Sequence, residues 1–590
     1  MNKGKNVFQY VMLIVGPILT YYLMEAFTIN ALTTTRVKAQ FLNIAVFELL
    51  MLFLLFLTGR AVAALEVLTA FFLLVGLLND YVLKFRSTPI VPWDIFSIRT
   101  ALSVAGNYSF SLGKREILVL LAFAGLFVVQ AFVNIKISGK KWALRLSGGV
   151  AACGLLVGEV LLLSQDTFVT KANLYPFLFT PTYMSQANGF TVTFLMDLRY
   201  LVVEKPDGYD SAYCEKLLEE YERKAEELAQ DNDTTLPNII VIMDEAFSDL
   251  HVLGDYDTNE EELPFLNSLR DGADNTISGY LNVSVKGGNT ANTEYEFLTG
   301  NSMAFLPAGS IPYQQYIKEE KSSLVTYLDS LGYRTIGMHP YRESGWNRNE
   351  VYPYLGFSQA LFLNDFTHAT VVRDYVSDQS DFDKIKELYE ENTDKPLFLF
   401  NVTMQNHGSY SEGFANLEET IQVKGSSGEA LNRYLSLLQL TDEALEDLLS
   451  YLSESERETV VVFFGDHQPN DTIAQAVYTL QGKSYTTLTE EETLLRYQVP
   501  YVIWANYDIE EETNADTSAN FLASKVLKAA GVPLDGYRLF LQDVQEEYPI
   551  VSAEQIQKAD GTILRDVSKE EGLSDYRCLA YYLLFDDERP

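Results

Sequence analysis

The sequence is poor in cysteine. It contains three, Cys153, Cys214 and Cys578, in 590 residues. Because Cys153 lies in an apolar stretch, only Cys214 and Cys578 are available to pair, and they can equally well stay free. A fold held together by a framework of disulfides is therefore excluded.

Basic residues are also scarce. The chain has 44 Lys and Arg against 80 Asp and Glu, a formal net charge of −36. The deficit is uneven, because residues 1–165 carry 14 basic and 7 acidic residues, a net of +7, which leaves −43 for residues 166–590. The strong negative charge of residues 166–590 repels the phosphates of nucleic acids. We therefore expect no nucleic-acid partner.

Long apolar runs, in contrast, are abundant near the N-terminus. Each is close to the ~20 residues that cross a bilayer. Five such runs in 165 residues leave little polar surface for a soluble protein. We therefore predict a five-helix transmembrane domain over residues 1–165, and no cleavable signal peptide is evident. The runs cover 7–27, 42–58, 62–82, 117–135 and 143–164.

The positive charges of the loops bear on orientation. Lys3, Lys5 and the basic loop 136–145 favour an N-terminus inside the cell. An odd number of spans then places the second part outside, so we expect a multi-pass protein of the cell membrane with an extracellular catalytic domain. The loop between the third and fourth spans runs against this pattern, because it carries Lys84, Arg86, Arg99, Lys114 and Arg115.

Residues 166–236 have the composition of a membrane-proximal connector. The stretch 188–210 is too interrupted to span a bilayer, although its apolar face could lie on the membrane surface. Residues 211–231 form an amphipathic, acid-rich pattern typical of a solvated surface helix. The turn formers of "DNDTTLP" end the connector, and the predicted catalytic domain covers 237–590.

Strand and helix patterns alternate from Pro237 onward. This alternation predicts an α/β domain in which helices cover both faces of a mostly parallel sheet. The expected strands are 238–245, 279–285, 333–339, 396–404, 459–467 and 500–505, and the expected helices are 264–271, 293–299, 321–331, 381–391, 428–453 and 517–530.

Acids and histidines gather where these strands end. The run "TVVVFF" has the length and β-branched content of a strand buried on both faces, and such strands carry ligands at their carboxyl ends. Asp466 and His467 follow that run, and Glu245 ends the first strand. His339 and His407 lie at or just past two other strands.

Thr290 lies on the glycine-flanked turn of "KGGNTANTEYEFLTG", which leads into a helix. The positive end of a helix stabilises anionic oxygen beside such a hydroxyl. A divalent cation bound by Glu245, Asp466 and His467, with Thr290 as fourth ligand, would activate that hydroxyl as a nucleophile. This donor set suits Mn²⁺ or Mg²⁺, and Zn²⁺ is also possible. The alternatives are a helix cap for Thr290 and a strand-end salt bridge for Glu245.

Five motifs, in this order after the apolar runs, resemble the lipoteichoic acid synthase family. These membrane phosphoglycerol transferases have an alkaline-phosphatase-like, sulfatase-type α/β ectodomain, and the loop "FRSTPIVPWDIFSI" fits the same resemblance. The motifs are "IIVIMDEAFSD", "GGNTANTEYEFLTGNS", "HPYRESGWNRNEVYPYLGF", "NVTMQNHGSY" and "VVFFGDHQP".

The resemblance implies roles for individual residues. Thr290 would be the nucleophile, and one metal ion, most often Mn²⁺, would be held by Glu245, Thr290, Asp466 and His467. The glycerol phosphate pocket would be lined by His339, Trp346, Arg348 and His407. The chemistry agrees for Arg348, whose planar fork suits phosphate oxygens, and for His407, which could protonate a leaving alkoxide as a catalytic acid. Tyr341 and Arg342 depart from the polar or acidic residues that family members often carry there.

The implied reaction is a ping-pong transfer. Glycerol phosphate would pass from phosphatidylglycerol to Thr290, and then to a glycolipid or polymer acceptor in lipoteichoic acid synthesis or that of a related polymer of a Gram-positive cell wall. A phosphoethanolamine transferase, a glycan-decorating glycerol phosphate transferase and a non-enzymatic envelope-polymer binding protein remain alternatives. A sulfatase activity is disfavoured, because that chemistry requires Cys-x-Pro-x-Arg where this chain has Thr290.

Overall fold

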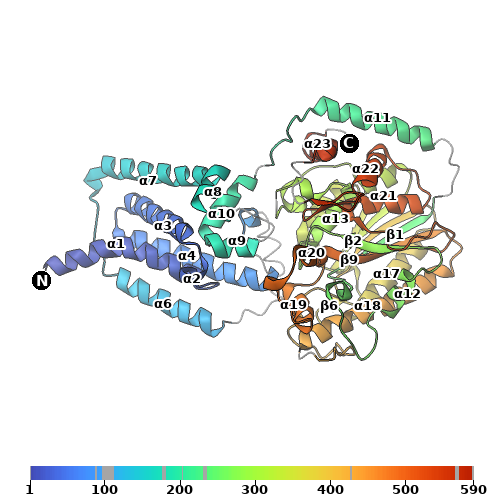
Figure 1. Cartoon of the computed structure of the whole chain (residues 1–590), viewed down its shortest axis with the longest axis horizontal. Coiled ribbons are helices and arrows are strands. Elements are labelled where there is room, and N and C mark those ends of the chain that lie inside the picture. Colours follow the sequence, from blue (N-terminus) through green and yellow to red (C-terminus); the bar gives the residue numbers. More distant parts are fainter. Residues whose placement is uncertain are drawn as a thin grey trace. The chain divides into compact units, whose positions relative to one another are not determined.

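The computed structural model describes residues 2–86, 89–95, 112–175, 181–201, 203–229, 236–307, 309–425, 428–564 and 570–587. The loop motif around Pro89 and the basic residue Arg99 therefore lie partly or wholly outside the described residues. The chain divides into two compact units (Figure 1), the first formed by residues 1–95 and 106–202 and the second including 203–590.

Long apolar helices build the first unit. They are α1 (Asn2–Glu25), α3 (Val37–Thr58), α4 (Ala61–Arg86), α6 (Lys114–Gln130) and α7 (Trp142–Leu163). Among the described residues, four segments are long and apolar enough to cross a membrane, namely Val7–Glu25, Val37–Thr58, Ala61–Lys84 and Gly139–Leu163. The predicted fourth span corresponds to α6, which at 17 residues is shorter than these four. These helices fit the predicted multi-pass membrane domain, with four candidate spans among the described residues where five were predicted.

The segment after α7 packs within the same unit. It forms α8 (Asp166–Ala172), α9 (Pro181–Asn188) and α10 (Phe190–Asp197), and α10 buries Val192 and Met196. The Asn43 side chain of α3 donates to the carbonyl of Asn188 and accepts from the backbone N–H of Val192. Gly189 between α9 and α10 has φ +80°, and a Cβ there would lie 2.5 Å from Asn43 Nδ2, so only glycine fits.

An amphipathic helix begins the second unit. Helix α11 (Ser211–Ala229) buries Cys214 and Leu218 and leaves most of its length exposed. Its buried face belongs to a cluster with α22 (Gly536–Glu547) and α23 (Ser574–Tyr581). Cys214 and Cys578 are both buried in that cluster and both free, which settles the alternative of a disulfide between them.

The second unit is built on an eight-stranded sheet in the order β10-β2-β9-β8-β1-β7-β3-β4. Only β9 is antiparallel to its neighbours. All six predicted strands are present, and two short edge strands, β4 and β10, were not predicted. The strands are β1 (Asn238–Asp244), β2 (Thr276–Asn282), β3 (Arg334–Met338), β4 (Gln359–Leu361), β7 (Leu397–Val402), β8 (Thr459–Gly465), β9 (Gln498–Ala505) and β10 (Thr517–Ser518).

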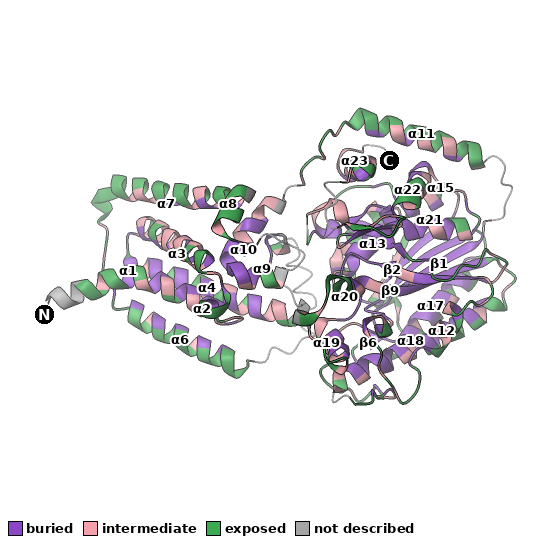
Figure 2. Cartoon of the chain, in the orientation of Figure 1, coloured by how far each residue is buried: buried purple, intermediate pink, exposed green. Residues whose placement is uncertain are grey.

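Helices cover both faces of this sheet, as predicted, and the strands between them are buried (Figure 2). Alternate residues of a strand point to opposite faces. In β1, Val241 and Met243 enter one core, while Ile240 and Ile242 enter the other. The first core includes residues of α13 (Thr290–Thr299), α15 (Leu324–Ser330), α16 (Arg348–Tyr354) and α21 (Ala519–Ala529), and the second includes residues of α12 (Pro264–Arg270), α17 (Asp378–Glu391), α18 (Glu429–Ser453) and α19 (Asp471–Leu480).

Seven of the eight strands, all except β9, run in one direction, and their carboxyl ends meet at one edge of the sheet. The longer ones are β1, β2, β3, β7 and β8. The polar residues that follow them, which include Glu245, His407 and Asp466, are thereby gathered at that edge. A ligand site at the carboxyl ends of parallel strands is the usual arrangement in open α/β sheets.

Candidate active site

Four predicted metal ligands come together at this edge. Ligand atoms of Glu245, Asp466 and His467 all lie within 4.8 Å of one another, and all three side chains are buried. His467 Nε2 lies 3.3 Å from Asp466 Oδ2 and 3.8 Å from Glu245 Oε1. The hydroxyl of Thr290 donates to Glu245 Oε2 at 3.0 Å. The structure thus provides two carboxylates, one imidazole and one hydroxyl around a single point.

Backbone contact between β1 and β8 brings the carboxylates together. Asp244 lies opposite Gly465 in the sheet, and the backbone N–H of Ala246 donates to Asp466 Oδ1 at 2.7 Å. A Cβ on Gly465 would lie 2.0 Å from the carbonyl oxygen of Phe247. Glycine at this position is therefore required for the close approach of the two loops, in the same way that glycine serves other sites of close backbone contact.

The start of α13 positions Thr290. Asn289, the residue before it, has the left-handed φ of +68°, and Thr290 is the first helical residue. The Thr293 hydroxyl, almost one turn later, donates to the carbonyl oxygen of Asp466 at 2.8 Å and so ties the helix to the metal-site loop. Because Thr290 donates to Glu245 rather than closing the helix end, its hydroxyl is directed at the ligand cluster and not used as a cap.

The cluster buries two carboxylates close together without a positive charge to balance them. Asp466 Oδ2 and His467 Nε2 are buried and have no hydrogen-bond partner among the described residues. Burial raises the pKa of Asp466 to about 7, and burial together with the charge of Asp466 raises the pKa of Glu245. Burial lowers the pKa of His467, which favours the neutral, metal-binding imidazole. These donors fit a divalent cation, which would satisfy both orphaned atoms and offset the two crowded acids.

Three histidines of the site share one arrangement. The Nδ1 atom of each lies within hydrogen-bond distance of a backbone carbonyl: 3.0 Å from Gln468 for His467, 2.8 Å from Val402 for His339 and 2.8 Å from Gly408 for His407. A carbonyl oxygen only accepts hydrogen bonds, so the proton sits on Nδ1. Nε2 of each ring is consequently the nitrogen left to bind a metal ion or to exchange a proton.

Arg348 lies near His339. Burial and the charge of Arg348 both lower the pKa of His339. The guanidinium is itself buried and committed to Glu294, with Nε 3.1 Å from Oε1 and 3.2 Å from Oε2. The hydroxyl of Tyr352 donates to the same carboxylate at 3.0 Å. Since Glu294 lies about one turn after Thr290, this ion pair holds Arg348 against the first half of α13.

The remaining predicted pocket residues lie on the loop after β3. Trp346 has φ +53° in the 3-10 turn Gly345–Asn347 and is half-buried against the core. Tyr341 is buried with Tyr375 and Met404, while Arg342 is exposed. Ring contacts continue from His339 to Tyr341 at 6.2 Å, from Tyr341 to Tyr375 at 6.0 Å and from Tyr375 to His407 at 5.5 Å.

Several residues of the site were missed by sequence reasoning. Glu294 carried a signal, because a helix that starts at Thr290 places position 294 on the same face. Arg373 and Tyr375 carried none, since their contacts with the His407 loop join segments more than 30 residues apart.

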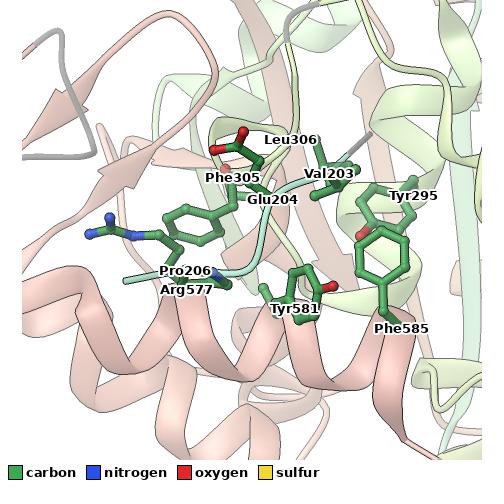
Figure 3. Close-up of a pocket in the computed structure, with 11 residues that line it drawn as sticks. Val203, Glu204, Pro206, Tyr295, Phe305, Leu306, Arg577, Tyr581 and Phe585 are labelled. Carbon is green, nitrogen blue, oxygen red and sulfur yellow. The ribbon is translucent and has the colours of Figure 1, made fainter. Parts of the chain in front are cut away.

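The second unit also has an aromatic-lined pocket elsewhere (Figure 3). Tyr295, Phe305, Tyr581 and Phe585 line it, with Val203 and Pro206 of the connector. None of the predicted metal or substrate residues contributes to it, so the pocket gives no information about the proposed chemistry.

Comparison with known proteins was consistent with these observations. A family model described as Sulfatase matches residues 237–532. A putative cyclic beta-1,2-glucan modification protein of Rhizobium meliloti is 30% identical over 426 residues, which cover 70% of this chain and 64% of the relative. Lipoteichoic acid synthase 1 of Bacillus subtilis is 26% identical over 274 residues, 45% of this chain and 41% of the relative. The chain thus spans less than two thirds of the length of either relative.

A solved structure has a similar fold over about two thirds of this chain. The Streptococcus pyogenes phosphoglycerol transferase GacH, in complex with sn-glycerol-1-phosphate, superposes with a TM-score of 0.54 and 22% sequence identity. The match covers 65% of this chain and 95% of that chain. The likeness concerns the fold alone.

Proposed function

We propose that this chain, which belongs to the sulfatase family and is a lipoteichoic acid synthase-like protein of the alkaline-phosphatase superfamily, transfers glycerol phosphate from phosphatidylglycerol to a cell-envelope acceptor. One observation carries the proposal: the hydroxyl of Thr290, at the positive end of α13, donates to Glu245 inside a ring of buried metal-ligating groups. A nucleophile beside orphaned ligand atoms is suited to covalent phosphoryl transfer.

Glu245, Thr290, Asp466 and His467 would hold one divalent ion. Two carboxylate oxygens, one imidazole nitrogen and one hydroxyl form a hard to borderline donor set, so we propose Mn²⁺, with Mg²⁺ and Zn²⁺ as competitors. When bound, such an ion lowers the pKa of a coordinated hydroxyl and withdraws charge from phosphate oxygens. The chain's own residues supply the remaining steps.

In the first half-reaction Thr290 attacks phosphorus. A bond forms between Oγ1 and phosphorus, while the bond between phosphorus and the diacylglycerol oxygen breaks. The hydroxyl proton passes toward Glu245 Oε2, its hydrogen-bond acceptor at 3.0 Å. His407 enters this step as the imidazolium, protonated on both ring nitrogens, and gives the Nε2 proton to the leaving oxygen as general acid. The ring is left neutral with its proton on Nδ1. Arg348 is held by Glu294 at the side of the nucleophile, where its remaining positive face is available to a phosphate.

In the second half-reaction these movements reverse. A hydroxyl of the acceptor gives its proton to Nε2 of His407 and attacks the phosphorus of the phosphoglycerol-threonine. Thr290 leaves and recovers a proton, so the enzyme returns to its starting state. His339 and Trp346 complete the pocket that we propose for the glycerol phosphate group.

The acceptor is the least constrained part of the proposal. The glucan modification protein matches a longer stretch of this chain at higher identity than lipoteichoic acid synthase 1 does. This difference favours, as a second candidate, transfer of glycerol phosphate onto a glycan over polymerisation. In either case the donor is a membrane lipid, which agrees with a multi-pass protein whose catalytic unit we propose to be extracellular.

The purified full-length protein, incubated with phosphatidylglycerol vesicles and Mn²⁺, tests the proposal. Mass spectrometry is expected to find a phosphoglycerol group on the peptide that contains Thr290, and Thr290→Ala is expected to lose both adduct and diacylglycerol release. A neutral glucan and a glycerol phosphate primer, offered separately, distinguish decoration from polymerisation. Diacylglycerol release by Thr290→Ala at nearly the wild-type rate would contradict the proposal and indicate a phosphodiesterase that activates water instead.

A further inference from the structure

A short hairpin holds the loop that carries His407. Strands β5 (Val371–Val372) and β6 (Tyr375–Val376) pair antiparallel, and Arg373 at their turn has φ +56°. The side chain of Asn416 donates to the carbonyls of Val371 and Arg373, at 3.0 and 3.1 Å. Asn416 thus holds the hairpin in place, and the side chains of Arg373 and Tyr375 contact the His407 loop.

Arg373 ties three alternate residues of that loop together. Its guanidinium donates to the carbonyl oxygens of Gln405 and His407, both at 2.6 Å, and of Ser409 at 2.9 Å. The side chain is almost fully buried, with 5% of its surface exposed. A guanidinium carries five N–H donors in one rigid plane, so it can bridge three carbonyls that a lysine ammonium could not hold in a fixed geometry.

Arg373 is a buried cation that forms no direct ion pair. None of the ion pairs among the described residues joins it to a carboxylate, and the charges of Asp374 and Asp378 act on it only at longer range. Its guanidinium lies over the rings of Tyr375 at 5.4 Å and Tyr410 at 5.5 Å. Burying a charge without a directly paired carboxylate is costly, and carbonyl dipoles and ring faces offset only part of that cost. This cost indicates that Arg373 serves to hold the His407 loop in one position and not only to stabilise the fold.

Tyr375 contacts the imidazole itself. Its hydroxyl lies 3.2 Å from Nδ1 of His407 and donates to the carbonyl of Gly408 at 3.3 Å. Because the hydroxyl proton is used on Gly408, a lone pair of Tyr375 is left to accept from Nδ1. The Nδ1 proton of His407 therefore has two acceptors, Tyr375 and Gly408, and Nε2 is the nitrogen that remains for proton transfer.

We propose that the β5–β6 hairpin is the positioning element of the general acid, with Arg373 fixing the loop and Tyr375 fixing the tautomer of His407. This inference rests on the proposed function. In the step concerned, the imidazolium form of His407 gives its Nε2 proton to the departing oxygen as the phosphorus–oxygen bond breaks, and Nδ1 keeps its own proton. The acceptor hydroxyl later returns a proton to Nε2, so protons balance over the cycle.

Two substrates with different leaving groups distinguish a role in general acid catalysis from a purely structural role. Diacylglycerol leaves as an alkoxide and needs a proton, whereas the p-nitrophenyl ester of glycerol phosphate releases a phenolate that does not. General acid catalysis contributes ~10²–10⁴-fold. On that scale, we expect Arg373→Gln to slow adduct formation from phosphatidylglycerol by ~10²-fold and Tyr375→Phe by ~10-fold. Both variants should lose less than ~3-fold with the p-nitrophenyl ester, where this catalysis is not needed.

Two matched variants control for general damage to the region. Arg433 is likewise a buried arginine, and it donates to the carbonyls of Tyr410 and Ser411 in the same loop at 3.2 Å without reaching His407. The hydroxyl of Tyr410 donates to the carbonyl of Asn406 and makes no bond with the imidazole. Arg433→Gln and Tyr410→Phe are expected to change the rates with both substrates in equal proportion.

A second measurement does not depend on activity. Solid-state nitrogen-15 NMR of the histidine-labelled full-length protein in lipid bilayers reports which ring nitrogen carries the proton, and His407→Gln assigns the signals among the five histidines of the chain. In spectra recorded at a pH where the ring is neutral, we expect an Nδ1–H tautomer for His407 in the wild type and a mixture with Nε2–H in Arg373→Gln and Tyr375→Phe. Equal losses with both substrates, or an unchanged tautomer in both variants, would overturn the inference. If the wild type forms no adduct with either substrate, the proposed function fails, and the tautomer alone decides the role of the hairpin.

Discussion

Thr290 and Glu245 are 45 residues apart in the chain, and the hydroxyl of one lies 3.0 Å from the carboxylate of the other. At the residue scale the site consists of such pairs, and burial shifts the pKa of their ionisable groups away from the value in water. Asp466 shows this most clearly, because its buried carboxyl group has a pKa of about 7 rather than the usual value near 4.

The first prediction follows from that carboxyl group. A folded-state pKa raised from about 4 to about 7 means that the metal-free protein is most stable below pH 4 to 5 as far as this group is concerned, and loses that contribution as the pH rises through 7. A divalent cation needs the ionised form, so Mn²⁺ affinity should rise between pH 6 and pH 8, with release of a proton. Isothermal titration calorimetry in buffers of different ionisation enthalpy measures both.

Asp466→Asn provides the comparison for this titration. The amide has the same shape and no proton to release, so we expect weaker Mn²⁺ binding, by ~10-fold or more on the scale of losses at metal sites, with little dependence on pH. A wild-type affinity that does not change between pH 6 and pH 8 would contradict the assignment of Asp466 as a ligand.

The second prediction concerns the buried pair of Arg348 and Glu294. Removing one partner of a buried ion pair leaves an uncompensated charge and costs about 3–5 kcal/mol, whereas replacing both by apolar residues is often neutral. We therefore expect Arg348→Met to lower the unfolding temperature of the detergent-solubilised protein strongly. Arg348→Met combined with Glu294→Leu should recover most of that loss, although it should not recover transfer activity. A single variant as stable as the wild type would show that the pair is not desolvated as the structure has it.

At the scale of elements, the edge of the sheet explains why these residues meet. Parallel strands present their carboxyl ends to the same side. The sheet topology alone therefore brings together the residues that follow β1, β3, β7 and β8. The remaining contribution comes from α13, which begins at Thr290 and points its positive end at the cluster.

The third prediction tests the contact between two of these elements. In Gly465→Ala the added methyl group would meet the carbonyl oxygen of Phe247, so β8 or the loop after β1 must shift. Overpacking of this kind costs about 1–3 kcal/mol, and here it would also separate Glu245 from Asp466. We expect loss of Mn²⁺ binding together with a lower unfolding temperature. Gly413→Ala, whose nearest neighbour is Arg433 Nη2 at 3.7 Å, is the control and should change neither.

At the scale of the whole molecule, the chain combines a membrane unit with a strongly acidic catalytic unit. Four segments of the described chain are long and apolar enough to cross a bilayer. The basic residues of the N-terminus and of the loop before α7 favour the cytoplasmic side, and both can lie there only if the shorter helix α6 crosses as well. A lipid donor for the proposed reaction is consistent with this organisation, because substrate and enzyme then share one membrane.

The fourth prediction concerns orientation. Two cysteine variants are made in a Cys153→Ser background, since Cys214 and Cys578 are buried and Cys153 is exposed. A cysteine in place of Glu219, exposed on α11, should react with a membrane-impermeant maleimide in intact cells. A cysteine in place of Lys140, in the loop before α7, should react only after the membrane is permeabilised. The opposite pattern would place the catalytic unit inside the cell and would argue against an envelope acceptor.

The sequence by itself determined the class of fold, the strands and the residues at their ends. Apolar runs covered on both faces predict buried parallel strands, and the carboxyl ends of such strands collect polar residues, so Glu245, Asp466 and His467 were predictable as a group. Tertiary structure alone decided that Arg348 is held by Glu294 and that Arg373 and Tyr375 hold His407. These contacts join segments with no regular spacing in sequence, and whether two such side chains meet depends on sheet register and loop packing rather than on local pattern.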